Sequence, residues 1–140
     1  IKENMTNSQK PYLTRGVLAN QTGINPETIR YYEKINLMPV PSRSAGGHRI
    51  YEDQHSQRLR FIKRCRALGF TLDEIRGLLT LVDRQEVSCE RVQHLADDHV
   101  ISIRRKIADL RSMERTPRDL SSQCSGKDVP ECPIMEALQK

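Results

Sequence analysis

Residues 25–33 read Asn-Pro-Glu-Thr-Ile-Arg-Tyr-Tyr-Glu, and this stretch decides how the first half of the chain is interpreted. Asn25 is a good helix cap, Pro26 suits the first helical position, and Glu27 places a negative charge in the first turn. A short apolar segment precedes this helix and is broken by Gly23. Two short helices joined by a turn predict a helix-turn-helix, with the quoted stretch in its second helix.

A small β-wing is predicted directly after the helix-turn-helix. Residues 39–51 are rich in Pro, Ser and Gly and then end in β-branched and aromatic residues. Gly46 and Gly47 together can supply the backbone conformation of a tight hairpin turn. The segment therefore predicts two short strands joined by this turn.

Two further helices complete the first half of the chain. They are predicted from about residue 53 to 68 and from about residue 71 to 81, the second opened by a Thr-x-x-Glu capping box. We therefore predict a mainly α fold with a winged helix-turn-helix DNA-binding domain over residues 13–83. Residues 1–12 are polar and without pattern, and they are interpreted as a flexible tail.

Charge is distributed unevenly along the chain, whose net charge is +5. Residues 1–70 hold 12 Lys and Arg against 5 Asp and Glu, whereas residues 71–140 hold 11 against 13. The first half therefore carries +7 and the second half −2. A basic first half indicates a polyanionic partner.

The composition argues against several other classes of protein. No apolar run approaches the roughly 20 residues that span a bilayer, and no basic-then-apolar leader is recognisable, so neither a membrane protein nor a secreted one is expected. Four cysteines without a leader indicate reduced thiols in the cytoplasm, where cysteine favours metal binding or redox chemistry. No constellation of nucleophile, base and orienting group is recognisable, so an enzyme is not expected.

One long helix is predicted over residues 88–121, as a dimerisation helix. Its apolar residues recur at steps of three or four and form one narrow stripe: Ala96, Val100, Ile103, Ile107, Leu110, Met113, Pro117 and Leu120. Because a lone helix cannot bury such a stripe, we expect it to pair with its own copy in a coiled coil, with packing onto residues 12–83 as the alternative. Pro117 removes a backbone donor, so the helix ends or kinks near it, or its last turn is distorted.

Two cysteines frame a loop in the last segment, residues 122–140. Cys124 and Cys132 are separated by seven residues that include Gly and Pro, and Pro133 suits the start of a short final helix. Cys89 lies 35 residues before Cys124, which corresponds to about 50 Å along a helix. In an antiparallel dimer, Cys89 of one chain would meet Cys124 and Cys132 of the other, and each dimer would hold two equivalent three-thiolate sites.

Other roles for the cysteines stay open at this point. Cys124 and Cys132 could form a disulfide, and a thiol redox-sensing regulator built on this pair is the alternative class of function. Cys65 lies between two arginines in a predicted helix and is expected to be a small structural residue.

Several longer motifs are recognisable along the chain. They are LTRGVLA at residues 13–19, ETIRYYE at 27–33, GHRIY at 47–51 and LGFTLDEI at 68–75. Together these motifs resemble the MerR family of metal-responsive transcription regulators, and the resemblance extends over residues 13–138. KIADL at residues 106–110, taken with the three cysteines, is most like the mercuric-ion regulators of that family.

The resemblance implies a homodimer in which two winged-helix heads are joined by an antiparallel coiled coil. Regulators of this family bind promoter DNA with an over-long spacer and hold it repressed without metal. When metal binds, they bend and untwist the DNA so that RNA polymerase engages both promoter elements. The implied partners are therefore double-stranded promoter DNA, a second copy of the chain and RNA polymerase.

The resemblance also assigns residues to two sites. The recognition helix and the wing of the family meet DNA at positions that correspond here to Asn25, Thr28, Arg30, Tyr31, Arg43, His48, Arg49 and Tyr51. Arginine suits phosphate or guanine contacts, and tyrosine suits a hydrogen bond to phosphate. Tyr32 is expected in the core instead. The three thiolate ligands of the family correspond to Cys89, Cys124 and Cys132.

Three thiolates suit a soft cation with trigonal coordination. We expect a mercuric ion first, followed by lead, cadmium and zinc, because zinc normally requires a fourth ligand. The resemblance implies that cysteine at position 89 marks sensors of divalent ions, whereas copper and gold sensors carry serine there. The spacing from Cys124 to Cys132, in contrast, resembles the loop of the copper sensors.

Overall fold

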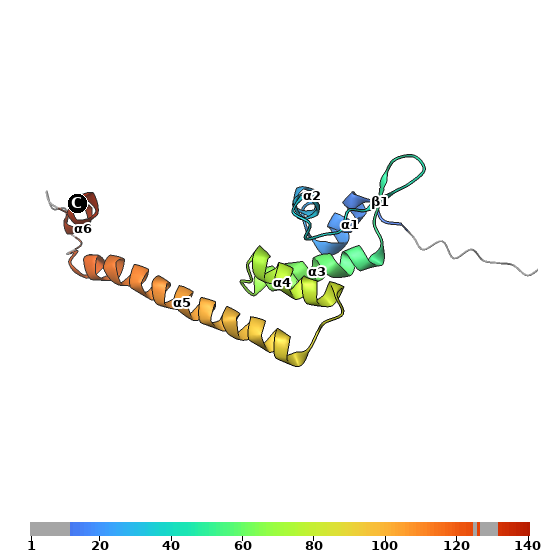
Figure 1. Cartoon of the computed structure of the whole chain (residues 1–140). Helices are drawn as coiled ribbons and strands as arrows, with labels where there is room; N and C mark the ends of the chain where they lie inside the picture. The colour runs from blue at the N-terminus through green and yellow to red at the C-terminus, as the bar shows by residue number, and fades with distance from the viewer. Residues whose placement is uncertain (1–11, 125, 127–131) are drawn as a thin grey trace, which may run out of the picture. The chain divides into compact units, whose positions relative to one another are not determined.

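The computed structural model describes most of the chain, and its helices and strands are drawn in Figure 1. The described residues are 12–124, 126 and 132–140. Most of the predicted tail and part of the predicted metal-binding loop lie outside them. The elements are α1 (Arg15–Thr22), α2 (Pro26–Lys34), β1 (Ser42–Arg43), β2 (Arg49–Ile50), α3 (Asp53–Ala67), α4 (Leu72–Asp83), α5 (Cys89–Ser122) and α6 (Pro133–Gln139). The mainly α prediction is confirmed.

The chain divides into two compact units, with the boundary between Ser88 and Cys89. The first unit carries α1 to α4 and the two strands, and the second carries α5 and α6. Each unit is described by itself below.

The first two helices form the predicted helix-turn-helix. Thr14 caps α1, because its Oγ1 accepts a hydrogen bond from the N–H of Val17 at 3.2 Å. Asn25 caps α2 in the same way, accepting from the N–H of Glu27 at 2.8 Å. Gly23, in the turn between them, has a φ of 68°, a left-handed conformation that glycine adopts without steric cost. Gly23 and Asn25 therefore end α1 and begin α2 as the sequence predicts, and Thr14 caps the start of α1.

The wing is a two-stranded antiparallel sheet, β1 and β2. In its register Ser42 lies opposite Ile50, and Arg43 lies opposite Arg49. Immediately after β2, Tyr51 forms an isolated bridge with Leu13, so the base of the wing is hydrogen-bonded to the segment that leads into α1. This bridge joins the wing to the start of the winged unit.

The helices α3 and α4 complete the core of the first unit. Their observed bounds lie within two residues of the predicted ones, and Thr71 and Glu74 form the expected capping box at the start of α4. Cys65 and Tyr32 are both buried in the core, as predicted. The buried apolar residues are Leu18, Ala19, Ile29, Tyr32, Leu37, Met38, Tyr51, Leu59, Ile62, Cys65, Ile75 and Leu79.

The long helix α5 continues past Pro117 to Ser122, so the possibility that it ends at this proline is wrong. Pro117 has no N–H, and the carbonyl of Met113 therefore lacks its usual helical donor. Glu114 and Arg118 form an ion pair in the turn around the proline. After α5 the chain continues to α6, which lies against α5 within the second unit.

The apolar stripe of α5 remains largely exposed in the single chain. Leu110 is 62% exposed and Met113 is 68% exposed, and Val100 and Ile107 are also exposed. Among the described residues of α5, only His99 is buried. In the part of the chain that the structure describes, no helix has both the length and the apolar character needed to cross a bilayer.

Candidate functional site

The predicted recognition helix α2 has accessible side chains at each position assigned to DNA. Asn25, Arg30 and Tyr31 are exposed, and Thr28 is half-buried. The side chain of Arg30 pairs with Glu27 at 3.4 Å, and both partners are well exposed, so this ion pair can be exchanged for a contact with phosphate at little cost. Ile29 lies on the opposite, buried side and holds the helix on the core.

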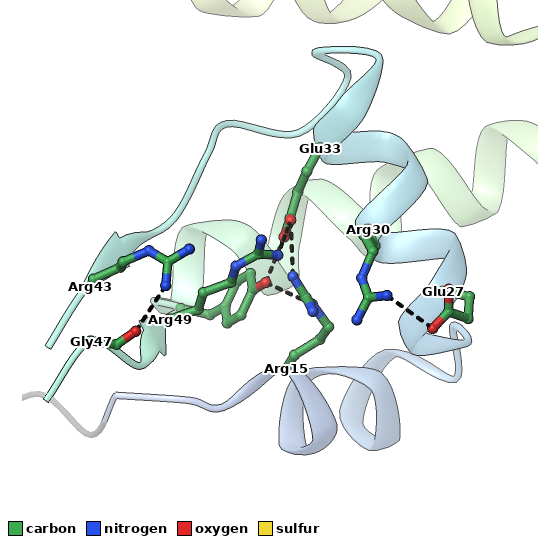
Figure 2. A network of polar contacts seen from close by, with 8 residues as sticks. Arg15, Glu27, Arg30, Glu33, Arg43, Gly47 and Arg49 are labelled. Atoms are coloured by element: carbon green, nitrogen blue, oxygen red, sulfur yellow. Dashed lines mark hydrogen bonds and ion pairs between the residues drawn. The ribbon is translucent and has the colours of Figure 1, made fainter.

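The wing adds three further basic or polar side chains. Arg43 and His48 are exposed, and Arg49 is half-buried. The Nη1 of Arg43 donates a hydrogen bond to the carbonyl of Gly47 at 2.9 Å, which orients this side chain along the hairpin (Figure 2). The wing therefore presents positive charge beside that of α2 in the same unit.

Figure 2 shows a compact polar network centred on Glu33, in the last turn of α2. The Nη2 of Arg15 donates to Glu33 Oε2 at 3.2 Å, and the Nη1 of Arg49 donates to the same oxygen at 3.0 Å. The hydroxyl of Tyr51 donates to Glu33 Oε1 at 2.5 Å, and the Nε of Arg15 donates to that hydroxyl at 3.1 Å. Three side chains, from α1 and the wing, are thus joined around the carboxylate of α2.

Tyr51 is fully buried, so the structure does not support the prediction that it contacts DNA. Its hydroxyl is already engaged by Glu33 and Arg15, and its ring makes an edge contact with His55. The pKa of Tyr51 is raised to about 12, mainly because the phenol is buried and secondly because it donates a hydrogen bond to Glu33. The phenol is therefore protonated at neutral pH. Tyr51 is therefore a structural part of the wing base.

Arg15 and Glu33 were not identified as functional residues from the sequence. A signal was available for Glu33, because Ile29, Tyr32 and Glu33 follow the i, i+3, i+4 spacing of one helix face, and Ile29 and Tyr32 are apolar. An acid on a buried face requires a basic partner, although the spacing does not identify Arg15 and Arg49 as the partners.

The three candidate metal ligands lie at the two ends of the second unit. Cys89 is exposed at the first residue of α5, Cys124 is exposed two residues beyond its end, and Cys132 is half-buried at the residue that precedes α6. All three are free thiols. A continuous helix between them separates Cys89 from Cys124 of the same chain by about 50 Å.

A single chain therefore does not bring the three thiols together. Within the described residues, no group of three or more His, Cys, Asp or Glu side chains is placed to hold a metal ion. The donor types nevertheless fit a soft cation, because thiolates are its preferred ligands. A site that combines Cys89 with Cys124 and Cys132 therefore requires a second chain.

Comparison with known protein families establishes the family of this chain. The family model described as "MerR HTH family regulatory protein" matches residues 13–82, and the one described as "MerR, DNA binding" matches residues 56–120. The chain belongs to the MerR family of transcription regulators. The resemblance found in the sequence is confirmed, and with it the expectation that the chain is a regulator and not an enzyme.

Individual MerR-family proteins are similar over nearly the whole chain. The mercuric resistance operon regulatory protein of Bacillus cereus is 48% identical over 126 residues, which cover 89% of this chain and 96% of that protein. The transcription regulator PbrR691 from Ralstonia metallidurans CH34, solved in complex with lead(II), is 43% identical with a TM-score of 0.77, covering 90% of this chain and 98% of that one. MerR from Bacillus megaterium MB1, solved in complex with mercury(II), is 43% identical with a TM-score of 0.70, covering 87% and 95%.

Proposed function

We propose that this MerR-family chain is a homodimeric, metal-responsive regulator that binds promoter DNA and senses a soft divalent ion. Mercuric ion is the preferred ligand, with lead, cadmium and zinc behind it. In this proposal the winged unit, residues 13–83, binds DNA. Residues 88–121 form the dimerisation helix, and residues 122–140 contribute metal ligands.

The proposed DNA interface combines the recognition helix with the wing. Its residues are Asn25, Thr28, Arg30, Tyr31, Arg43, His48 and Arg49. Their accessible side chains and the +7 balance of residues 1–70 support contacts with the phosphate backbone and with base edges. Tyr51 is left out because its side chain is fully buried.

The proposed metal centre lies between two chains and uses Cys89 of one protomer with Cys124 and Cys132 of the other. The observation that carries this proposal is the unbroken helix α5, which separates these thiols by about 50 Å within one chain. An antiparallel partner supplies the missing thiols at each end. The exposed apolar stripe of α5 supports the same arrangement, because burying it requires a second surface.

The chemistry of the donors supports mercury as the preferred ion. Three thiolates satisfy Hg²⁺ in trigonal geometry, whereas zinc is normally four-coordinate. The solved relatives with bound mercury and bound lead, at equal identity to this chain, support soft divalent ions as a class. Metal binding would then couple the ends of the dimer helices to the DNA-binding units. Metal binding would thereby change the shape of the promoter DNA, and this change would allow RNA polymerase to engage the promoter.

The decisive experiment uses mixed dimers of the full-length chain. Cys89→Ser and the double variant Cys124→Ser/Cys132→Ser each lack a complete site in any homodimer. A dimer with one copy of each variant has one intact site, because Cys89 of the second chain faces Cys124 and Cys132 of the first. After subunit exchange at equal concentrations, the three-thiolate charge-transfer absorbance of bound Hg²⁺ should reach about a quarter of the wild-type value.

The control is Cys65→Ala, which removes a buried thiol that is not part of the proposed site and should leave this absorbance unchanged. If mixing restores no three-thiolate signal, the site between chains does not exist. Reporter induction by peroxide, with loss of the Cys124 and Cys132 thiols and no response to any of the four metals, would instead establish the redox-sensing alternative. Titration with mercury, lead, cadmium and zinc ions ranks the candidate ligands.

A further inference from the structure

Glu33 is an acidic residue in the helix that is proposed to meet DNA, and its side chain is only 8% exposed. A carboxylate loses several kcal/mol of hydration when it is buried, and this cost is offset only by well-placed partners. Negative charge near a DNA-binding surface also opposes binding of a polyanion. Its position therefore requires a function that outweighs both costs.

The two arginine partners of Glu33 come from two different elements outside α2. Arg15 is the first residue of α1, whereas Arg49 belongs to β2 of the wing. Both guanidinium groups donate to the same oxygen of Glu33, at 3.2 Å and 3.0 Å. Tyr51 occupies the other oxygen and also accepts from Arg15, which closes a ring of contacts. The carboxylate thus brings two arginines from separate elements together (Figure 2).

The two arginines retain hydrogen-bonding capacity after these contacts. A guanidinium has five N–H donors. Within the described residues, Arg15 uses its Nε and Nη2 atoms and Arg49 uses its Nη1 atom, so each retains N–H groups that point elsewhere. The side chain of Arg15 is 18% exposed and that of Arg49 is 36% exposed. Two positive groups and one negative group leave a local charge of +1, which suits one phosphate.

We propose that Glu33 is a positioning residue that holds Arg15 and Arg49 together as one phosphate-binding site, at the junction of the recognition helix and the wing. The ligand is a phosphodiester of the DNA backbone, and Arg15 thereby joins the DNA contacts. The inference rests on the proposed DNA binding of this unit. Pre-orientation by a buried carboxylate removes the entropy cost of ordering two long side chains when DNA binds.

A charge-neutralising substitution separates positioning from simple electrostatics. Glu33→Gln removes one negative charge with almost no change of size, so electrostatics alone would make DNA binding tighter. If Glu33 positions the two arginines, the same substitution makes binding weaker. Glu27→Gln is the matched control, because Glu27 is also in α2, makes the same change in net charge, and is 75% exposed.

The measurement is the affinity of the full-length protein for a mixed-sequence DNA duplex of about 30 base pairs, over a range of salt concentrations. Phosphate contacts do not depend on base sequence, so this probe reports them directly. Glu33→Gln should weaken binding on the order of tenfold and reduce the salt slope by roughly one to two units, since each phosphate contact contributes about 0.9. Glu27→Gln should bind as tightly as wild type or more tightly.

The inference is overturned if Glu33→Gln binds as tightly as Glu27→Gln. Circular dichroism melting tests whether Glu33→Gln is folded. If it is not, Arg15→Lys provides the test, because lysine keeps the charge but cannot donate to both Glu33 and Tyr51 in this geometry. Wild-type affinity and salt slope in Arg15→Lys would then overturn the inference. Failure of wild-type protein to bind any duplex would instead refute the proposed DNA-binding function itself.

Discussion

The two units of this MerR-family chain differ in how far they bury their apolar side chains. The first unit, ending at Ser88, encloses a core of apolar side chains from four helices and the base of the wing, and it pairs its buried acid Glu33 internally. The second unit, beginning at Cys89, leaves the apolar stripe of α5 exposed and separates its thiols by the length of a helix. One unit satisfies its side chains within a single chain, whereas the other leaves its apolar stripe exposed and its thiols apart.

The physical reason is the geometry of the elements. Four short helices that cross one another can enclose residues from every side, so a small core closes locally. A single helix of 34 residues has no second element along most of its length, and its apolar stripe can be covered only by another surface. The contrast predicts that substitutions in the two units have different consequences.

The largest expected effect is the loss of the proposed dimer in Leu110→Asp. A charge in the centre of the apolar stripe cannot be buried against a second helix, so the molar mass from light scattering should fall from two chains to one. Ser112→Asp is the matched control, because it adds the same charge to an exposed position outside the stripe and should leave the dimer intact. A dimer that survives Leu110→Asp would show that this stripe is not the interface.

A smaller effect is expected from Leu59→Ala in the core of the first unit. Leu59 is fully buried, so its truncation should lower the free energy of unfolding by about 2 to 5 kcal/mol, through lost burial and the cavity left behind. Urea unfolding measures this change, and light scattering should still report a dimer. Val40→Ala, at an exposed position, should change the free energy by less than about 0.5 kcal/mol. Equal effects at the two positions would contradict the described core.

The smallest expected effect is a pH-dependent loss of stability that requires Tyr51. The folded state raises the pKa of this phenol from about 10 to about 12, so the folded protein holds the proton more tightly than the unfolded chain. The stabilisation is therefore complete below about pH 10 and is lost as the pH rises towards 12. Between pH 9 and pH 11 the expected loss is on the order of 1 kcal/mol. Urea unfolding at pH 9 and pH 11 should show a smaller decline in Tyr51→Phe than in wild type. Tyr31→Phe, at an exposed tyrosine, should retain the wild-type decline, and equal declines in all three proteins would contradict the buried hydroxyl.

Much of the fold was predictable because it depends on local signals. Asn25 and Thr71 cap their helices in the structure, as short-range hydrogen bonding predicts. The burial of Tyr32 and Cys65 follows from their places on apolar helix faces. Pro117 was harder to interpret, because the loss of one backbone donor favours an end or a kink of the helix, yet α5 continues to Ser122.

The candidate site was predictable only in part. The motif positions identify the accessible arginines of α2 and the wing, and the spacing of the cysteines predicts that one chain cannot assemble the metal site. The same reasoning assigned Tyr51 to the DNA contacts. No local feature of an aromatic residue in a wing motif shows whether it donates a hydrogen bond to phosphate or packs in the core. Its partners, Arg15 and Glu33, lie 36 and 18 residues away in the sequence.

The sequence by itself determined where helices begin, which faces are apolar, that the first half is basic, and that Cys89 and Cys124 are too far apart to share an ion within one long helix. These properties depend on neighbouring residues or on the fixed rise of a helix. Only the tertiary structure decided that Arg15 and Arg49 converge on Glu33 and that Tyr51 faces inward. Such contacts join residues that are distant in the chain, and they exist only once α1, α2 and the wing have packed together.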